Sequence, residues 1–438
     1  MGDSTLGLSG ATAIGLGGMI GGGVFSVLGV VAAIAGSAAW AAFTAASLVS
    51  LCAAYSYIKL NEVNDVQGGS VTQIQATVGN STLAGMVGWT LLFGYVGAIA
   101  MYGYAFGSFA VRLAPLDSLF GLPMRPFFSV LAVGLFVALS VLGARATGSS
   151  EKILVALKVA ILFGISAWGL YYGFTVNRLQ FGTSQFASVG FVTAIAISFV
   201  SFQGWQLLMY DHDSIEDPQS TIPKAVYISI AGAIVIDSMV AILVTSLVKT
   251  SVIQQHPEIA VAKAVEPFLG QVGFVAVALA ALFSTGSAIN GTLFSAANFS
   301  KGMLSDGLLP DRFGDSDADG APTRAVLVLG VLSAAFAAYG SLSGITSFGS
   351  LAFMVVFGVM SYIAFRKRDE DAIRGAIPAV GVAGTALFFP LLLWHLYTAE
   401  RGTFFAVVLI SVAVVGVELL YFERDDLKET VERVESKA

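Results

Sequence analysis

Long runs of apolar residues dominate this chain, and short polar stretches separate them. A helix that crosses the hydrocarbon core of a bilayer needs about 20 mainly apolar residues. Twelve runs have about this length, and they cover roughly residues 11–35, 38–58, 83–111, 127–143, 153–174, 188–210, 225–248, 269–300, 325–342, 344–365, 376–398 and 402–421. The runs are continuous and too long for the alternating strands of a transmembrane barrel. The pattern therefore predicts an all-α polytopic membrane protein with 12 transmembrane helices.

The composition agrees with this pattern. Hydrophobic residues make up 56% of the 438 residues and charged residues 11%, whereas soluble domains carry about 25% charged residues. We expect a single transmembrane domain over residues 1–421 and a charged cytoplasmic tail over 422–438. Cys52 is the only cysteine. The sequence therefore predicts neither a disulfide framework nor a cysteine metal site, and it suggests no cofactor.

The distribution of basic residues predicts the orientation, because Lys and Arg near span ends favour the cytoplasmic side. With both termini in the cytoplasm, 15 of the 22 basic residues fall inside and six outside, and Lys158 lies within a span. No basic region or cleavage signature precedes the first run, so we expect that run to stay in the mature protein. These features predict a multi-pass protein of the cytoplasmic membrane. The net charge of −6 offers no basic face for nucleic acid.

Consecutive glycines interrupt the first apolar run near its middle. Gly21, Gly22 and Gly23 follow one another there, and each costs about 1 kcal/mol of helix propensity relative to alanine. One interpretation is close helix packing, because Gly17 and Gly21 form a small-xxx-small pair. Packing does not require three glycines in a row, so we favour a discontinuous helix.

A second polar interruption lies near the middle of the sixth run. Ser201, Gln203 and Gly204 would form an unusual cluster on a lipid-facing helix. Two interrupted helices five spans apart are typical of inverted-repeat transporters, which bind their substrate at the membrane midplane. Free N–H groups at such a break suit a carboxylate, and free carbonyls suit an ammonium group. The two breaks therefore predict a site for a zwitterionic amino acid.

The order of several motifs resembles the amino acid, polyamine and organocation (APC) superfamily. The motifs are the stretch 17–25 with 26–29, the region 54–57 with 68–70, the stretch 199–205 with 215–218 and 222–225, and the segment 281–290 with 305–310. Each motif alone is weak, but together they extend over nearly the whole chain. The resemblance implies the leucine-transporter fold, with a 5+5 inverted repeat. The repeats would cover about 11–174 and 188–365, and the peripheral helices 376–398 and 402–421.

The candidate substrate residues lie on the two interrupted helices and on two neighbouring helices. They are Ile20, Gly21, Gly22, Gly23, Ser201, Phe202, Gln203, Gly204 and Trp205, with Tyr95 on helix three, chosen by the resemblance, and Asn290 on helix eight. Phe202 and Trp205 either gate the site or simply pack, and both alternatives stay open. The pocket segments hold no acidic side chain, so we expect a small or neutral amino acid as substrate.

Lys158 is the first of two charged residues inside predicted spans. Such residues are costly and usually functional, although a position about 8 Å into the helix also lets the stem reach the headgroups. In sodium-independent members of the superfamily, a helix-five lysine contacts a helix-one carbonyl and a helix-eight hydroxyl in place of a sodium ion. By this resemblance the partners of Lys158 are Gly17 and Ser284, with Ser287 nearby. A lysine removed from water can release its proton near neutral pH, so we expect proton coupling without sodium.

Asp237 is the second charged residue inside a predicted span. It lies near mid-depth of the seventh run, and it is unusual for the superfamily. Two interpretations stay open. It is either a protonated or hydrogen-bonded acid that faces neighbouring helices, or a second carrier of protons.

Together these features predict a secondary active amino acid transporter that works by alternating access. Its partners would be an amino acid, protons and the lipid bilayer. An amino acid exchanger, a carrier of polyamines or cationic amino acids, a channel and a membrane substrate sensor stay open as alternatives. An enzyme is disfavoured, because the chain has no Walker-type nucleotide loop and no recognisable metal or nucleophile–base set.

Overall fold

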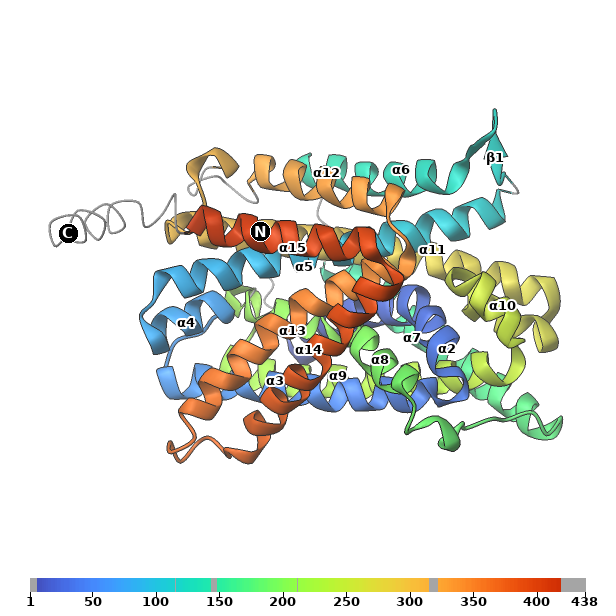
Figure 1. The fold of residues 1–438 in the computed structure, drawn as a ribbon, viewed down its shortest axis with the longest axis horizontal. Helices are drawn as coiled ribbons and strands as arrows, with labels where there is room; N and C mark the ends of the chain where they lie inside the picture. Colours follow the sequence, from blue (N-terminus) through green and yellow to red (C-terminus); the bar gives the residue numbers. More distant parts are fainter. Residues whose placement is uncertain (1–5, 115, 143–147, 211, 315–321, 419–438) are drawn as a thin grey trace, which may run out of the picture.

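The computed structural model is a bundle of helices, most of which run roughly along the horizontal axis of Figure 1. The structure describes residues 6–114, 116–142, 148–210, 212–314 and 322–418. The predicted tail over 422–438 lies outside these residues. The prediction of an all-α fold is confirmed, since a two-residue hairpin is the sole strand pair in the described ranges.

The first half of the chain places five of the predicted spans and one helix that was not predicted, α4. In order, the elements are α1 (Leu8–Gly22), the π-helical turn η1 (Gly23–Val27), α2 (Leu28–Ala35), the 3₁₀ turn η2 (Gly36–Ala38), α3 (Ala39–Asn64), α4 (Ser70–Val78), α5 (Ser81–Leu113), β1 (Ser118–Leu119), β2 (Leu122–Pro123), α6 (Met124–Val141) and α7 (Gly148–Thr175).

The second half adds a further unpredicted helix, α10, and several 3₁₀ turns. In order, the elements are η3 (Thr183–Gln185), α8 (Val189–Ser198), η4 (Phe199–Phe202), η5 (Trp205–Met209), η6 (His212–Ser214), α9 (Pro218–Leu247), α10 (Thr250–Gln255), η7 (Pro257–Ile259), α11 (Ala260–Ser305), η8 (Asp311–Phe313), α12 (Thr323–Tyr339), α13 (Leu342–Arg366), α14 (Ala376–Ala399) and α15 (Arg401–Val417).

Polar caps and a kink explain several helix boundaries. The side chains of Asn80, Ser188 and Ser341 accept hydrogen bonds from the first turns of α5, α8 and α13, and such caps contribute about 0.5–2 kcal/mol each. Helix α11 starts earlier than the predicted 269, and Gly270 divides it with a φ of 61°. That left-handed conformation suits glycine, which lacks a Cβ. The predicted span corresponds to the part of α11 after this kink.

The helices have the length and composition of membrane spans. In the part of the chain that the structure describes, nine helical segments are long and apolar enough to cross a bilayer, and Thr323–Tyr339 and Arg401–Val417 are shorter apolar helices. One of the nine, Leu8–Asn64, has 57 residues and contains the first two predicted spans. The count of 12 spans and the inverted repeat stay predictions.

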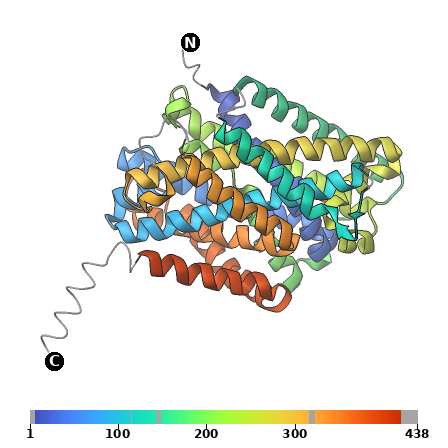
Figure 2. The same cartoon turned by 90° about the horizontal axis from the view of Figure 1, so that it is seen from above.

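The two interrupted spans lie in the interior, and other helices surround them. Helix α1 contacts α7, α9 and α11. It also contacts the turn η5 of the sixth span, and the turn η1 of the first span contacts α8 of the sixth. Helix α15 lies at the outer edge of the bundle in Figure 2. Outside α1, the residue Leu6 pairs with Ile215 after the sixth span, with Leu6 N–H donating to the Ser214 carbonyl at 2.7 Å. The ends of the two interrupted spans are therefore joined.

Candidate functional site

The interruption of the sixth span packs directly on the backbone of the first. Gly204 has a φ of 131°, and a Cβ there would lie 3.0 Å from Met19 N and 3.1 Å from the Gly18 carbonyl carbon. A Cβ on Gly18 would in turn lie 3.1 Å from the Gly204 Cα. Glycine at both positions allows the two backbones to approach this closely. The structure thus brings together the two breaks that the sequence placed far apart.

The break in the first span is a widened turn and not a gap between two half-helices. The Gly23 N–H donates to Met19 four residues back, whereas the Leu28 N–H donates to Gly23 five residues back. The six N–H groups of residues 23–28 therefore have only the five carbonyls of residues 19–23 as acceptors. One N–H in the turn η1 thus has no carbonyl of its own. Turns of this kind are frequent at functional sites.

The same geometry frees a carbonyl where the turn ends. After Leu28 the pattern returns to four residues, because the Gly36 N–H donates to Ala32. The nine N–H groups of residues 28–36 therefore have ten carbonyls, those of residues 23–32, as acceptors, which is one carbonyl more than they need. Of the three consecutive glycines, Gly23 offers no free N–H, since its N–H is bonded inside the helix to the Met19 carbonyl. The turn supplies one donor and one acceptor, which are fewer groups than a full break would supply.

Most polar groups at the break of the sixth span already have partners. The Gly204 N–H donates to Gln206 Oε1 at 2.6 Å, and Ser50 Oγ on α3 donates to the Phe202 carbonyl at 3.2 Å. Gln203 donates to the Tyr102 hydroxyl. Sequence reasoning did not select Ser50, Gln206 or Tyr102. Ser50 and Gln206 carry no motif signal, whereas Tyr102 belongs to a run of tyrosines on the third span.

Tyr102, and not the predicted Tyr95, contacts both interrupted spans. Its hydroxyl lies 3.4 Å from the Gly18 carbonyl, and its ring lies 2.4 Å from the position of a Cβ on Gly22. Tyr95 is fully buried between Phe299 and Phe353. Seven residues along α5 separate the two tyrosines, which is about 10 Å at 1.5 Å per residue.

Phe202 and Trp205 pack against neighbouring helices. The Trp205 ring lies against Tyr57 and Phe357, with centroid distances of 5.2 and 5.0 Å, and its indole N–H donates to Ser50. The Phe202 ring lies 6.3 Å from that of Phe43. Both side chains are fully buried. Of the two alternatives, these contacts favour packing in this conformation.

Asp237 faces the turn in the first span, from the middle of α9. Its carboxylate oxygens lie 3.2 and 3.4 Å from the position of a Cβ on Gly23, and Ser201 Cβ lies 3.0 Å from the same point. Asp237 is completely buried. The expectation that the pocket segments lack an acidic group is thus incomplete, because the acid comes from a third helix whose sequence contains no break.

Lys158 lies on α7 and is 7% exposed. Its ammonium donates to the Gly17 carbonyl at 2.9 Å. A Cβ on Gly17 would lie 2.9 Å from Val155 Cγ2 and 3.8 Å from Lys158 Nζ. The small residue in the first span therefore lets α7 and the lysine approach its backbone.

The expected contact between Lys158 and Ser284 is not formed. The buried Ser284 hydroxyl has no hydrogen-bond partner among the described residues, and the Ser284 carbonyl lies 3.3 Å from the position of a Cβ on Gly21. Gly21 is one turn beyond Gly17, about 6 Å along the axis, so Ser284 faces the wrong turn for this contact. Ile20 is fully buried beside these residues in α1, and Ser287 and Asn290 are half-buried on α11.

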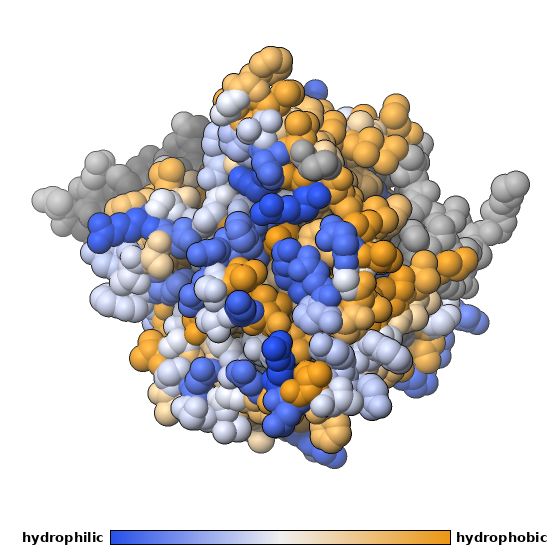
Figure 3. All heavy atoms as spheres, turned by 90° about the vertical axis from the view of Figure 1, so that its right-hand side faces the viewer, coloured by the Kyte–Doolittle hydropathy of each residue, from blue (hydrophilic) through white to orange (hydrophobic). Residues whose placement is uncertain are grey.

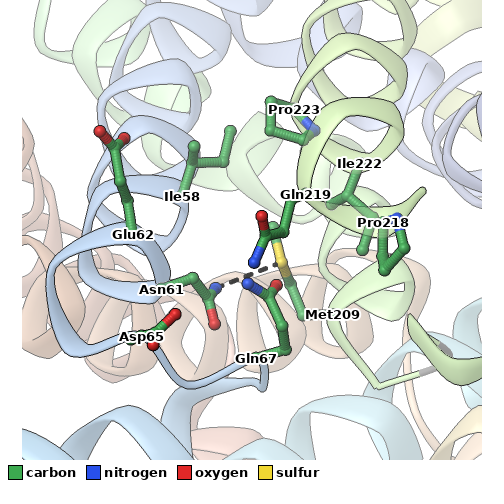
Figure 4. A pocket seen from close by; sticks show the side chains of 10 residues that line it. All are labelled: Ile58, Asn61, Glu62, Asp65, Gln67, Met209, Pro218, Gln219, Ile222 and Pro223. Carbon is green, nitrogen blue, oxygen red and sulfur yellow. Dashed lines mark hydrogen bonds between the residues drawn. The ribbon is translucent and has the colours of Figure 1, made fainter.

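A separate cavity of about 270 Å³ lies where α3 ends and α9 begins. Figure 4 shows Asn61, Glu62, Asp65 and Gln67 on one side and Pro218, Gln219 and Pro223 on the other. Asn61 donates to Met209 Sδ at 3.7 Å across its base. Asp237 follows Ile222 by 15 residues on α9, about 22 Å along the axis, so this cavity is distinct from the site at the breaks. The described residues contain no group of three His, Cys, Asp or Glu side chains that could hold a metal ion.

Comparison with known proteins gives matches over nearly the whole chain. A family model described as amino acid permease matches residues 6–418. An uncharacterized protein of Methanocaldococcus jannaschii is 29% identical over 421 residues, which cover 94% of both chains. The inner membrane transport protein YbaT of Escherichia coli is 27% identical over 401 residues, which cover 91% of both chains.

A solved structure has the same arrangement of helices. The crystal structure of a manganese transporter mutant from Eremococcus coleocola superposes with a TM-score of 0.61, over 96% of this chain and 94% of that one. Its sequence identity is 14%, so the likeness concerns the fold alone.

Proposed function

Because the chain belongs to the amino acid permease family, we propose that it moves small or neutral amino acids across the cytoplasmic membrane by alternating access, coupled to protons and independent of sodium. The protein is a multi-pass membrane transporter and not an enzyme. The substrate, the coupling ion and the mechanism are the proposed part.

The contact between the two interrupted spans supports an amino acid site there. The substrate residues of the proposal are Ile20 to Gly23, Ser201 to Trp205 and Asn290, and the buried Tyr102 joins the two spans. The turn in the first span has one N–H and one carbonyl in excess. Such a pair matches the carboxylate and the ammonium group of a zwitterion.

The hydrogen bond from Lys158 to the Gly17 carbonyl is the observation that carries the proposed coupling. An ammonium needs acceptors when it is buried, and a charge-assisted bond to a carbonyl is one of the stronger contacts available. While Lys158 is protonated, this bond ties α7 to the first span. A neutral amine binds the carbonyl more weakly, so deprotonation would free the first span to move.

Uptake into proteoliposomes tests this function. We expect uptake of L-alanine or L-leucine to follow an inward proton gradient and to be unaffected by a sodium gradient. Lys158→Gln keeps an N–H donor but cannot titrate, so it should abolish the response to the pH gradient and retain exchange. Lys59→Gln is the control, because Lys59 lies in a partly exposed ion pair with Glu62. Uptake driven by sodium alone, or a Lys158→Gln protein that still follows the proton gradient, would contradict the proposal.

A further inference from the structure

Asp237 and Ser201 together leave three oxygen atoms without a partner beside the break. Within the described residues, both carboxylate oxygens of Asp237 and the Ser201 hydroxyl have no hydrogen bond, and both side chains are buried, Asp237 at 0% and Ser201 at 1% exposure. The Asp237 carboxylate oxygens lie 3.2 and 3.4 Å from the position of a Cβ on Gly23, and Ser201 Cβ lies 3.0 Å from the same point, so both side chains pack closely against Gly23. A buried polar group without a partner costs about 1–3 kcal/mol, and more when it is charged.

Three polar groups at the break of the sixth span do not share this deficit. Gln206 satisfies the Gly204 N–H, Ser50 donates to the Phe202 carbonyl, and the Tyr102 hydroxyl accepts from Gln203. Besides Asp237 and Ser201, the buried hydroxyls of Ser26 in η1 and of Ser284 on α11 have no hydrogen bond among the described residues. A hydroxyl can donate as well as accept, whereas an ionised carboxylate only accepts, so the Asp237 carboxylate calls for a donor that no described side chain beside it supplies.

We propose that Asp237, together with Ser201, receives the ammonium group of the transported amino acid where the turn η1 begins at Gly23. An ammonium group has three N–H donors and a positive charge, which suit the negative carboxylate of Asp237 and the hydroxyl oxygen of Ser201. A proton on Asp237 would remove the negative charge, but it would turn one carboxylate oxygen into an O–H donor that needs an acceptor of its own. The inference rests on the proposed function, and it names the group by which the site selects its substrate.

The carboxylate of the amino acid would have a backbone N–H donor close by. The turn η1 begins at Gly23 and has one N–H without its own carbonyl. Lys158 binds the first span at Gly17, six residues earlier, which is about 9 Å along the axis. The two charged side chains therefore act at different points on the same span, Asp237 at the substrate and Lys158 at the helix contact.

This arrangement predicts strong selection for an amine. A site built to hydrogen-bond an N–H group rejects an analogue without it, because its own buried acceptors are left unpaired. The 2-hydroxy acid of the same side chain should therefore bind poorly, whereas the matching amine without a carboxylate should keep part of the affinity.

Binding to the purified protein in detergent tests the inference with two matched sets of probes. The first set is L-alanine, L-lactate and ethylamine, and the second is L-leucine, L-2-hydroxyisocaproate and 3-methylbutylamine. In the wild type we expect an amino acid to bind at least about 100-fold more tightly than its hydroxy acid. Asp237→Asn should reduce this ratio to below about tenfold, and Ser201→Ala should reduce it by about fivefold. Asp306→Asn, an exposed acid at the end of α11, should leave the ratio unchanged.

Four results would overturn the inference. One is an unchanged ratio in Asp237→Asn with an altered pH dependence of uptake, which indicates a proton carrier. Another is an unchanged ratio with a lower melting temperature in the absence of any ligand, which indicates a structural role. A third is wild-type binding that requires sodium chloride and fails in choline chloride, which indicates a metal ion at Asp237. The fourth applies if Asp237→Asn is not recovered folded. Ser201→Ala is then the deciding variant, and an unchanged ratio of amino acid to hydroxy acid affinity in it would overturn the inference.

The failure of the proposed function has a different signature. A wild-type protein that binds 3-methylbutylamine through Asp237 but neither binds nor transports any amino acid would refute amino acid transport while the ammonium site stands. A protein that transports amino acids with an unchanged ratio in both variants would refute the ammonium site alone.

Discussion

Gly204 is the residue at which the contact between the two interrupted spans is most sensitive to one added carbon. Its φ of 131° lies in a region that other residues rarely adopt, and a Cβ would approach the Met19 nitrogen to 3.0 Å. Such backbone strain costs about 1–3 kcal/mol. The atoms that a Cβ meets belong to the backbone and not to a flexible side chain, so relief requires the two spans to move apart.

We therefore expect Gly204→Ala to lower the melting temperature by several degrees and to reduce uptake by about tenfold or more, since about 1.4 kcal/mol corresponds to a factor of ten. Gly164→Ala on α7 is the matched control, because Gly164 is exposed and a Cβ there meets no atom within 4 Å. Alanine is the better helix former by about 0.5–1 kcal/mol, so the control should be neutral or slightly stabilised. Melting curves and uptake by the same preparation measure both effects. Equal behaviour of the two variants would show that the close approach of the spans is unimportant.

At the scale of elements, α5 links the two interrupted spans through one tyrosine. Tyr102 accepts from Gln203 of the sixth span, lies 3.4 Å from the Gly18 carbonyl of the first, and packs its ring on Gly22. A movement of either span must therefore change a contact with α5.

Tyr102→Phe removes this link and leaves the Gln203 amide without its acceptor. An unpaired buried donor costs about 1–3 kcal/mol, so we expect weaker amino acid binding, by about fivefold to 100-fold, with the protein still folded. Tyr95→Phe removes a hydroxyl from the same helix at a position packed by Phe299 and Phe353, and it should change binding much less. Titration calorimetry of both variants with L-leucine makes the comparison. A larger loss in Tyr95→Phe than in Tyr102→Phe would restore the choice made from sequence.

The helices were predictable from sequence, whereas the detail of the breaks was not. A run of apolar residues long enough to span a bilayer has few alternatives to a helix, and three consecutive glycines correctly marked where the first span departs from α-helical geometry. The sequence could not distinguish a π-helical turn from a full break, because the choice depends on packing against Asp237, Ser201 and Tyr102. The same limit applies to Ser50 and Gln206, whose roles arise from contacts between segments distant in the chain.

Partners of buried charges were the other uncertain part. The lysine contact with Gly17 is present, whereas that with Ser284 is not. Periodicity assigns a residue to a helix face, but a difference of one turn between Gly17 and Gly21 decides which neighbour it meets. Asp237 was noticed because charge is rare inside spans, yet only the fold places it beside Gly23.

At the scale of the whole molecule, the surface has the distribution expected of a membrane protein. Helices α6, α7 and α14 expose large apolar side chains, among them Phe127, Trp168 and Leu387. Figure 3 shows the end of the bundle that carries β1 and α10, where hydrophilic residues gather on the middle of the face and hydrophobic residues surround part of it. The polar end and the apolar sides indicate how the bundle would sit in lipid, but they do not distinguish the two sides of the membrane.

The basic residues predict the orientation, and two introduced cysteines would measure it. Ala76 lies near the end of α4 and Ser118 in β1; both are exposed, and they belong to connections on opposite sides of α5. With both termini in the cytoplasm, a Cys52→Ser protein carrying Ser118→Cys should react with a membrane-impermeant maleimide in intact cells, and one carrying Ala76→Cys should react only in inverted vesicles. The excess of basic residues on the Ala76 side provides the physical reason, since translocating Lys and Arg is unfavourable. The Cys52→Ser protein alone is the background control. Labelling of Ala76→Cys from outside intact cells would reverse the orientation, and with it the direction in which the Lys158 site and the proposed proton gradient act.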